Sequence, residues 1–274
     1  MPSLALESVA HVYARGNVRA LDGVSLHIEA GERLAIVGQN GSGKTTLVRH
    51  LDGLLRPSAG RVLLDGTDVA KRTVAQLAHS VGLVFQDPES QIFAGSVRAE
   101  VEFGPRNLGM RAAALRAAVD EALSAVGLAG DERTNPYDLG SARQKLLALA
   151  SVLAMQTPVL VLDEPTTGQD LRGVATVRAV IEAAHAAGRT VIAISHDMEF
   201  VASAFDRVLV MRAGRLILDG PPASVFAEPA WEALRSTYLE PTLAARAGAR
   251  LGLGATPTDA ALIAALRGSE PGPA

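Results

Sequence analysis

The chain has 274 residues, of which 48% are hydrophobic and 20% charged, so it suits one large domain or one domain with an appendage. It carries 26 Lys and Arg against 29 Asp and Glu, and the resulting net charge of −3 gives no reason to expect a nucleic-acid partner. The lack of cysteine excludes disulfides and cysteine-ligated metal sites.

Neither the N-terminus nor any apolar run predicts insertion into a membrane. The first residues, MPSLALESVAHVYARG, lack the basic start and long apolar core of a signal peptide. Runs such as TPVLVLDEP and RTVIAISHD are far shorter than the roughly 20 residues that a membrane helix needs. We therefore expect that any work at a membrane is done by docking on a protein that spans it.

Strands and helices alternate along most of the chain. Apolar and polar residues alternate in LALESVAHVYA and ALDGVSLHIEA, which predicts β-strands there. The elements predicted after them are a buried strand at 34–38, a helix from Lys44 to about Leu55, a strand with an Asp-Gly turn at 60–69, a buried strand at 81–85, a helical insertion at about 95–155, apolar strands at 159–162 and 190–194 with a helix between them, and a strand pair at 207–218. This order predicts an α/β fold with a parallel, helix-covered sheet.

The composition changes near residue 220. Residues 1–220 are predicted to form the main domain, and the Pro/Ala-rich stretch with short helices at 221–268 a small appendage. The last residues, 269–274, are predicted to be a flexible tail.

A glycine-rich loop follows the strand at 34–38. GQNGSGKTT fits G-x-x-x-x-G-K-[ST], in which backbone N–H groups and a helix N-terminus surround phosphates. Lys44 is expected to place its charge at the β- and γ-phosphates, and the Thr45 hydroxyl to ligate Mg²⁺. A glycine-rich turn without a ligand is the alternative. The nucleotide-binding residues predicted here are Gly38, Gln39, Asn40, Gly41, Ser42, Gly43, Lys44, Thr45 and Thr46.

Two later strands end in groups suited to phosphate chemistry. Asp163 closes the apolar strand VLVLD and is expected to hold Mg²⁺ through water. Glu164, expected to point to the other side, would polarise the attacking water. His196 follows the strand VIAIS at the carboxyl end of the sheet, where it would hydrogen-bond the γ-phosphate. We predict Glu164, His196 and Lys44 as the catalytic residues and ATP with Mg²⁺ as cofactors.

These three motifs, in this order and approximate spacing, resemble the ATPase subunit of ATP-binding-cassette (ABC) transporters over residues 3 to about 220. The resemblance implies a P-loop NTPase of ABC type, with a RecA-like core sheet, an N-terminal antiparallel β region and a helical signature subdomain. It further implies that Tyr13 stacks on adenine, that Gln86 contacts Mg²⁺ and senses a membrane partner, and that TTGQD (166–170) lies where two subunits meet. Gln169 stands there in place of the usual leucine.

The stretch FQDPESQIFAGSVRAEVEFGPRNLGM (85–110) resembles the energy-coupling-factor (ECF) branch of the family. That branch imports vitamins and transition-metal ions. Ile92 and Phe93 are expected to receive a coupling helix from a membrane subunit; packing of the insertion against the core is the alternative. The appendage resembles the branch's C-terminal helical extension, which contributes to pairing of the ATPases.

LGSARQKLLALASVLAM (139–155) stands where the family has Leu-Ser-Gly-Gly-Gln and a helix. In the family this signature clasps the γ-phosphate bound to a partner ATPase. Glycines permit the close approach, because no Cβ intervenes. The predicted signature residues are Gly140 at the serine position, Ser141 and Ala142 at the glycine positions, and Arg143, whose charge would still attract phosphate. This degenerate signature favours a heterodimer with a second ABC ATPase, and a slower homodimer is the alternative.

The sequence thus predicts an ATP-hydrolysing motor of an ECF importer, bound peripherally at the cytoplasmic face of the membrane through a transmembrane coupling subunit and a substrate-binding membrane subunit. A conventional ABC importer ATPase and a mainly regulatory nucleotide-binding subunit are the alternatives. A non-transport ABC protein is a third, but such proteins usually have two cassettes or a long coiled-coil insertion.

Overall fold

Two β-sheets organise the chain, whose computed structural model describes residues 2–269. The smaller sheet is antiparallel, with strand order β2-β1-β4-β5. The larger sheet has the order β10-β9-β3-β8-β7-β6, in which only β10 runs antiparallel to its neighbour. The strands are β1 (Leu4–Tyr13), β2 (Val18–Ile28), β3 (Arg33–Val37), β4 (Ala59–Leu64), β5 (Thr67–Asp68), β6 (Val81–Val84), β7 (Val159–Asp163), β8 (Thr190–Ile194), β9 (Arg207–Arg212) and β10 (Arg215–Gly220).

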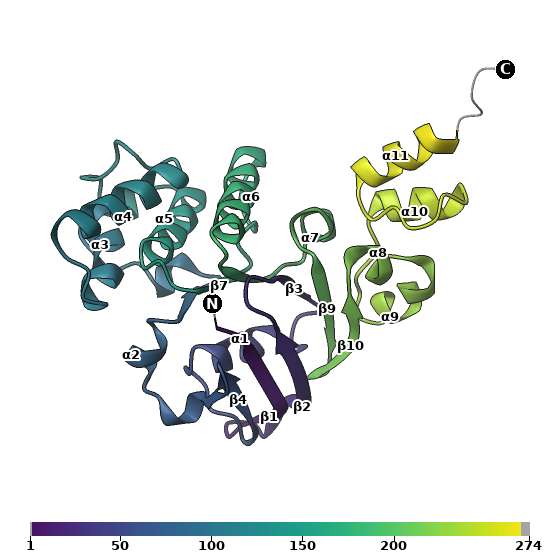
Figure 1. Ribbon diagram of the computed structural model, residues 1–274, viewed down its shortest axis with the longest axis horizontal. Helices are drawn as coiled ribbons and strands as arrows, with labels where there is room; N and C mark the ends of the chain where they lie inside the picture. Colours follow the sequence, from purple (N-terminus) through teal and green to yellow (C-terminus); the bar gives the residue numbers. More distant parts are fainter. Residues whose placement is uncertain (1, 270–274) are drawn as a thin grey trace.

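Helices α3 to α11 form three groups, which Figure 1 shows along the long axis of the molecule. Those of the insertion, α3 to α5, lie at one end, those of the appendage, α8 to α11, at the other, and α6 and α7 lie between them over the large sheet. The helices are α1 (Lys44–Leu51), α2 (Val74–Leu77), α3 (Val97–Asn107), α4 (Ala112–Ala125), α5 (Ser141–Leu153), α6 (Leu171–Ala186), α7 (Met198–Ala204), α8 (Pro222–Val225), α9 (Trp231–Arg235), α10 (Leu243–Arg250) and α11 (Asp259–Ser269), with short 3₁₀ turns η1 (Val69–Lys71), η2 (Pro88–Ser90), η3 (Pro136–Asp138) and η4 (Glu228–Ala230).

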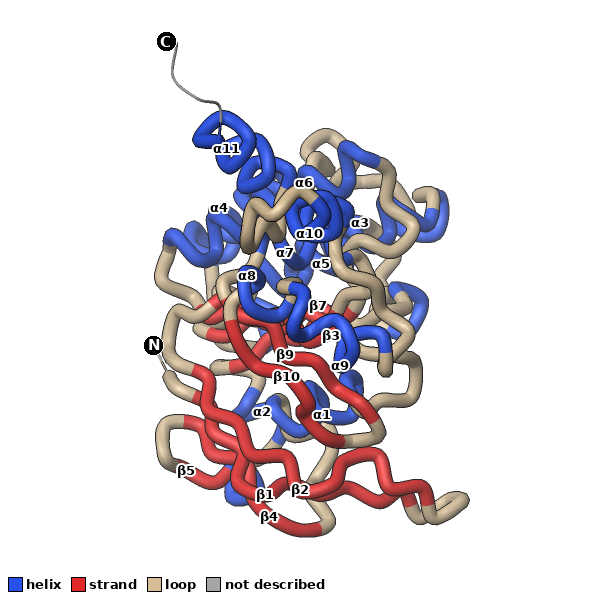
Figure 2. The backbone as a smooth tube through the Cα atoms, turned by 90° about the vertical axis from the view of Figure 1, so that its right-hand side faces the viewer, coloured by secondary structure: helices blue, strands red, loops and turns tan. Residues whose placement is uncertain are grey.

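The large sheet separates two hydrophobic cores, because successive side chains of a strand point to opposite faces. In β7, Val159 and Val161 pack with α1 and the small sheet, whereas Leu160 and Leu162 pack with the helices α4 to α7. Figure 2 shows the small sheet at the end of the molecule opposite α10 and α11. Because β3, β7 and β8 are parallel neighbours, the loops that follow them meet at one edge of the sheet.

The predicted α/β fold is confirmed, with three local differences. Helix α1 ends at Leu51 rather than near Leu55, because Gly53 takes the left-handed conformation (φ +75°) that ends helices. The segment predicted as a strand at 60–69 is a hairpin, in which Asp65 and Gly66 both have positive φ and form the turn. Helix α11 continues to Ser269, and the rest of the predicted tail, 270–274, lies outside the described residues.

Candidate functional site

The glycine loop between β3 and α1 has a backbone that only glycine adopts easily at two points. A Cβ on Gly38 (φ +147°) would lie 2.2 Å from the Met211 carbonyl oxygen, and one on Gly43 (φ +103°) would lie 2.4 Å from that of Ala20. Both obstacles are backbone atoms and cannot move aside like a side-chain end. The loop is therefore held between β2 and β9, with the N-terminus of α1 at its end.

Lys44, the first residue of α1, is buried and turned back over this loop. Its Nζ donates hydrogen bonds to the carbonyl oxygens of Gly38, at 2.6 Å, and Gln39, at 3.0 Å. Burial lowers the pKa of Lys44, against the opposing charges of Glu164 and Asp163. The loop thus has its one positive side chain beside two carboxyl groups.

Asp163 and Thr45 form a pair at the start of α1. The Thr45 hydroxyl donates to Asp163 Oδ2 at 3.0 Å, and Asp163 Oδ1 is buried without a hydrogen-bond partner among residues 2–269. Burial raises the pKa of Asp163, while the Thr45 hydrogen bond and then Arg49 and Lys44 oppose it. A hydroxyl and a carboxylate with an unsatisfied oxygen are the ligands that Mg²⁺ accepts, so the residues fit this cation.

Glu164 lines the same cavity as Asp163, and its φ of +54° places its backbone in the left-handed region. The Thr167 hydroxyl donates to Glu164 Oε2 at 3.1 Å. Glu164 Oε1 lies 2.9 Å from His196 Nε2 but receives no hydrogen bond from the described part of the chain.

Glu164 and His196 both favour their neutral forms more than exposed residues would. Burial raises the pKa of Glu164, against the Thr167 hydrogen bond and the charge of Lys44. Burial and then the charge of Lys44 lower the pKa of His196 below its ordinary value. The Glu164–His196 contact therefore joins two groups whose charged forms are both disfavoured by burial.

Most of the predicted nucleotide residues line one cavity of about 440 Å³, a size typical of ligand sites. The cavity is also lined by Val18, Ala20 and Ile194, which were not predicted because they belong to no recognisable sequence motif. Ser42 is fully buried instead, with no partner for its Oγ within residues 2–269. The predicted residues that line the cavity are Tyr13, Asn40, Gly41, Gly43, Lys44, Thr45, Thr46, Gln86, Asp163, Glu164 and His196.

The glycine loop and the carboxylate strand fall inside the region that matches a family model. Residues 21–167, more than half of the chain, match the model described as "ABC transporter". The chain belongs to the ABC transporter family. It is an ABC-type ATPase.

Relatives whose names state a role in transport support the ECF branch of the ABC family. The chain is 43% identical over 232 residues to the cobalt import ATP-binding protein CbiO of Rhodobacter capsulatus, with 84% of this chain and 82% of that protein covered. It is 40% identical over 236 residues to the energy-coupling factor transporter ATP-binding protein EcfA2 of Clostridium perfringens, with 82% of each covered. The resemblance to this branch is thereby confirmed.

A solved structure agrees. CbiO1 of Clostridium perfringens, described as part of the ABC transporter complex cbiONQ, has a TM-score of 0.74 at 38% identity, with 85% of this chain and 93% of that one covered. A putative ABC transporter ATP-binding protein of Methanosarcina acetivorans is 42% identical over 245 residues, which are 89% of this chain. The match spans only 39% of that longer relative. Among residues 2–269, no helix has the length and apolar character to cross a bilayer.

The ABC signature position lies apart from this cavity, at the start of α5. Gly140 caps the helix without a side-chain hydrogen bond, and Gly140, Ser141, Ala142 and Arg143 are not among the described residues that line the cavity. Arg143 forms an ion pair with Asp131. The charge expected to attract phosphate is therefore already partnered in this structure.

Two contacts join the signature helix α5 to the TTGQD loop of the same chain. Gln169 Nε2 donates to the Ala142 carbonyl oxygen at 2.9 Å, and Lys145 Nζ donates to that of Thr167 at 2.7 Å. Since Thr167 also bonds Glu164, the start of α5 is connected to the carboxylate of the cavity. Lys145 was not predicted, because no motif marks it.

The 85–110 stretch divides into a buried and an exposed part. Ile92 is 5% exposed and packs in the core, so the packing alternative is correct for it. Phe93 is 58% exposed and meets Phe103 edge to face, with ring centroids 4.7 Å apart. The buried Glu100 accepts hydrogen bonds from the N–H groups of Phe93 and Ala94, which fixes this loop.

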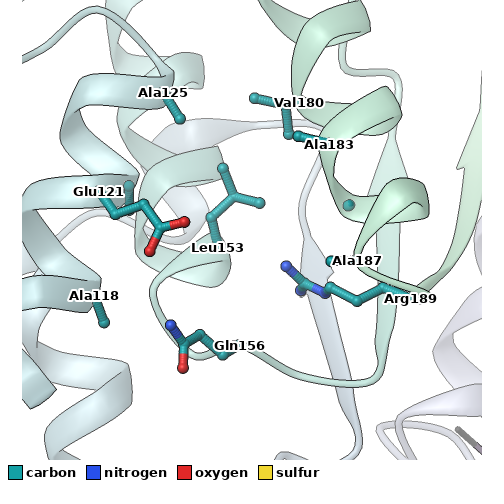
Figure 3. A pocket seen from close by; sticks show the side chains of 11 residues that line it. Ala118, Glu121, Ala125, Leu153, Gln156, Val180, Ala183, Ala187 and Arg189 are labelled. Atoms are coloured by element: carbon teal, nitrogen blue, oxygen red, sulfur yellow. The ribbon is translucent and has the colours of Figure 1, made fainter.

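A groove that the sequence did not predict lies between α4, the end of α5, and α6 (Figure 3). It has a volume of about 330 Å³ and mostly alanine walls. Glu121 and Arg189 project from opposite walls, with Leu153 and Gln156 between them. Arg189 Nε donates to the Thr157 carbonyl oxygen at 2.7 Å, and burial lowers the pKa of this guanidinium. The groove thus lies where the helical insertion meets the core.

Proposed function

We propose that the chain is the ATP-binding and ATP-hydrolysing motor of an ECF-type importer, which powers uptake of a vitamin or transition-metal ion through a membrane partner. The observation that carries it is the buried Glu164 carboxylate, whose Oε1 lies 2.9 Å from His196 Nε2 and accepts no hydrogen bond from residues 2–269, in the same cavity as the glycine loop. The R. capsulatus relative is named for cobalt import and the C. perfringens relative for an energy-coupling factor transporter, and both names support a role in transport.

The glycine loop would hold the triphosphate. Gly41, Gly43 and the first residues of α1 line the cavity, and phosphate oxygens would compete with the carbonyls of Gly38 and Gln39 for Lys44 Nζ. Thr45, Gln86 and, through water, Asp163 would hold Mg²⁺. The bound cation would neutralise charge that develops on the phosphates. Tyr13 would stack on adenine, with Val18 and Ala20 beside it.

Glu164 would orient the attacking water and take its proton. The carboxylate is held by Thr167 at Oε2, so Oε1 is the oxygen that remains for the water. Neutral His196 would donate a hydrogen bond to the γ-phosphate, and its lowered pKa leaves Nε2 free of a second positive charge beside Lys44. General-base assistance of this kind contributes about 10²- to 10⁴-fold to a rate.

We further propose that the active assembly pairs this chain with a second ABC ATPase carrying an intact signature. Gly140 and Ser141 are exposed at the N-terminus of α5, which would present backbone N–H groups to a partner's phosphate. The Cβ of Ala142 and the Arg143–Asp131 pair work against the close approach that the family's glycines permit. Residues 1–220 would be the nucleotide-binding domain and 221–268 an extension that aids pairing.

The membrane partner would dock on the insertion. The groove between α4 and α6 offers apolar walls with one charge of each sign, and the exposed Phe93–Phe103 pair offers an aromatic surface. A helix from a transmembrane coupling subunit suits both, and a separate substrate-binding membrane subunit would choose the cargo. The chain would then lie at the cytoplasmic face of the membrane.

The test is the molar mass of purified Glu164→Gln protein, alone, in saturating Mg-ATP, together with ATP binding by calorimetry and hydrolysis by the wild type. A monomer that binds ATP supports pairing with a second cassette. A stable homodimer would contradict the heterodimer and leave the motor intact. Equal, slow hydrolysis by wild type and variant, measured with the partner ATPase present, would overturn the motor in favour of a regulatory subunit.

A further inference from the structure

Two buried histidines lie behind the aromatic wall of the nucleotide cavity. His11 is on β1, the strand that ends with Tyr13, and is 8% exposed. His50 is on α1, the helix that begins at the glycine loop, and is fully buried. Neither is among the described residues that line the cavity, and neither has a role in the proposed mechanism.

The hydrogen bonds fix the tautomer of each ring. His50 Nδ1 lies 2.6 Å from the Thr46 carbonyl oxygen, which only accepts, so Nδ1 carries the proton and Nε2 is left as an acceptor. His11 Nδ1 lies 3.1 Å from the Arg56 carbonyl oxygen and 3.2 Å from His50 Nε2. It is therefore the donor to both.

The two rings also pack against each other. The two imidazoles meet edge to face, with centroids 4.9 Å apart, and a proton added to His50 Nε2 would face the N–H of His11. Burial lowers the pKa of His50, and the neighbouring His11 adds to this effect. The Arg56 side chain turns away and donates to the carbonyls of Val69 and Arg72.

The histidine pair joins Tyr13 to the glycine-loop helix through a closed ring of contacts. The Tyr13 ring meets His11 edge to face, with centroids 4.6 Å apart and planes at 75°. The Tyr13 hydroxyl lies 3.1 Å from Thr46 Oγ1 and hydrogen-bonds it. Since His50 holds the Thr46 carbonyl, the circuit runs from Tyr13 to His11, His50, Thr46 and back.

We propose that His11 and His50 are positioning residues for the nucleotide base: they hold Tyr13 in one rotamer, with its ring face toward the cavity, and tie that rotamer to the helix that carries the phosphate loop. The inference rests on the proposed function, in which Tyr13 stacks on adenine. A side chain already ordered in the free protein loses no rotamer freedom on binding, so its stacking contributes fully to affinity.

Two variants at His11 separate the ring contact from the hydrogen bond. His11→Phe keeps an aromatic edge against Tyr13 but cannot donate to His50, and His11→Asn keeps a donor but removes the ring. His27→Asn is the matched control, because His27 lies on the adjacent strand β2 and is exposed with Glu29 as its partner.

The measurement is the affinity for Mg-ATP and for Mg-tripolyphosphate, by calorimetry, on each purified full-length variant. Tripolyphosphate occupies the glycine loop but has no base to stack. We expect both His11 variants to bind Mg-ATP about three- to tenfold more weakly, the size of one lost aromatic contact or hydrogen bond, with tripolyphosphate affinity unchanged. His27→Asn should bind both as the wild type does.

An unchanged ratio of the two affinities in both His11 variants would overturn the proposal. Tyr13→Phe, which removes only the hydroxyl at Thr46, gives the same test should a His11 variant fail to fold, and a two- to threefold loss specific to ATP is expected. Wild-type protein that binds no Mg-ATP would instead overturn the proposed function. Tyr13→Ala with undiminished ATP affinity would remove the premise that Tyr13 stacks on the base.

Discussion

Gln169 Nε2 donates a hydrogen bond to the carbonyl oxygen of Ala142, 2.9 Å away. Both residues stand where the ABC pattern has another: Gln169 replaces a leucine in the TTGQD loop, and Ala142 replaces a signature glycine. The bond holds the first turn of α5 against the loop that leads from Glu164. Two departures that appear unrelated along the chain are therefore one contact in the fold.

Removing this bond should affect activity and not only stability. Gln169→Leu leaves the Ala142 carbonyl without its partner, and we expect a loss of about 1 kcal/mol in the free energy of unfolding by urea. Because the TTGQD loop bears Thr167, which holds Glu164, the ATPase rate of the assembled pair should also fall. Gln144→Leu is the control: it breaks a similar bond from α5 to the Pro136 carbonyl, and an equal drop in rate there would contradict the specific role of Gln169.

The ATPase rate should fall on acidification at a higher pH than an ordinary glutamate would give. Glu164 must be ionised to accept a proton from water, and burial raises its pKa above the usual value of 4.5. Burial and then the charge of Lys44 lower the pKa of His196, so the imidazole gains its proton at a more acidic pH than an ordinary histidine does. The pH dependence of kcat measures this, and a profile unchanged in His196→Ala would support Glu164 as the titrating group. An acid limb centred at or below 4.5 would contradict it.

The buried carboxyl group of Asp52, which is not among the described residues that line the nucleotide cavity, should make the protein less stable at neutral pH than at acidic pH. Burial raises the pKa of Asp52 from 3.8 to about 6, so the folded chain binds more protons than the unfolded chain between these values. The stability that Asp52 provides is complete below the unfolded pKa and is lost as the pH rises through the folded one. Asp52→Asn keeps the acceptor for the Leu54 N–H and removes the charge.

We expect Asp52→Asn to raise the free energy of unfolding by about 1–3 kcal/mol at pH 8, and by nearly nothing at pH 4. Urea unfolding at both pH values measures the difference. Asp138→Asn, at an exposed position, should change stability by less than about 0.5 kcal/mol at either pH. An equal effect of Asp52→Asn at both pH values would show that the charge is not its cause.

The glycine loop offers a matched pair of substitutions. A Cβ on Gly43 would lie 2.4 Å from the Ala20 carbonyl oxygen, whereas a Cβ on Gly41 (φ +77°) has no neighbour within 4 Å among the described residues. Gly41→Ala should therefore cost about 1–2 kcal/mol for the left-handed conformation alone. Gly43→Ala adds a backbone clash, so we expect more than about 3 kcal/mol. Equal unfolding free energies for the two variants would contradict the steric argument.

The parts of the site that short sequence motifs form could be predicted from the sequence. The glycine loop, Asp163 and His196 each follow a recognisable strand, and parallel neighbours bring strand ends together, so their meeting was foreseeable. The left-handed backbone of Glu164 could not be predicted, because a positive φ is rare at a residue other than glycine. The Gln169–Ala142 bond and the Glu121–Arg189 groove depend on how helices pack, which no short motif encodes.

If the proposed heterodimer is correct, restoring the signature should allow the chain to pair with itself. The triple exchange Gly140→Ser, Ser141→Gly and Ala142→Gly, made in Glu164→Gln protein, supplies the hydroxyl and removes the Cβ at both glycine positions. Lys145 and its bond to Thr167 stay in place, so α5 keeps its attachment to the TTGQD loop. With saturating Mg-ATP we expect the restored protein to double its molar mass in solution, while the Glu164→Gln parent stays monomeric.

Arg143→Ala in the same parent is the control, since it frees Asp131 without restoring a glycine. Dimers in the Arg143→Ala control and none in the triple variant would mean that the Arg143–Asp131 pair, rather than the missing glycines, prevents self-pairing.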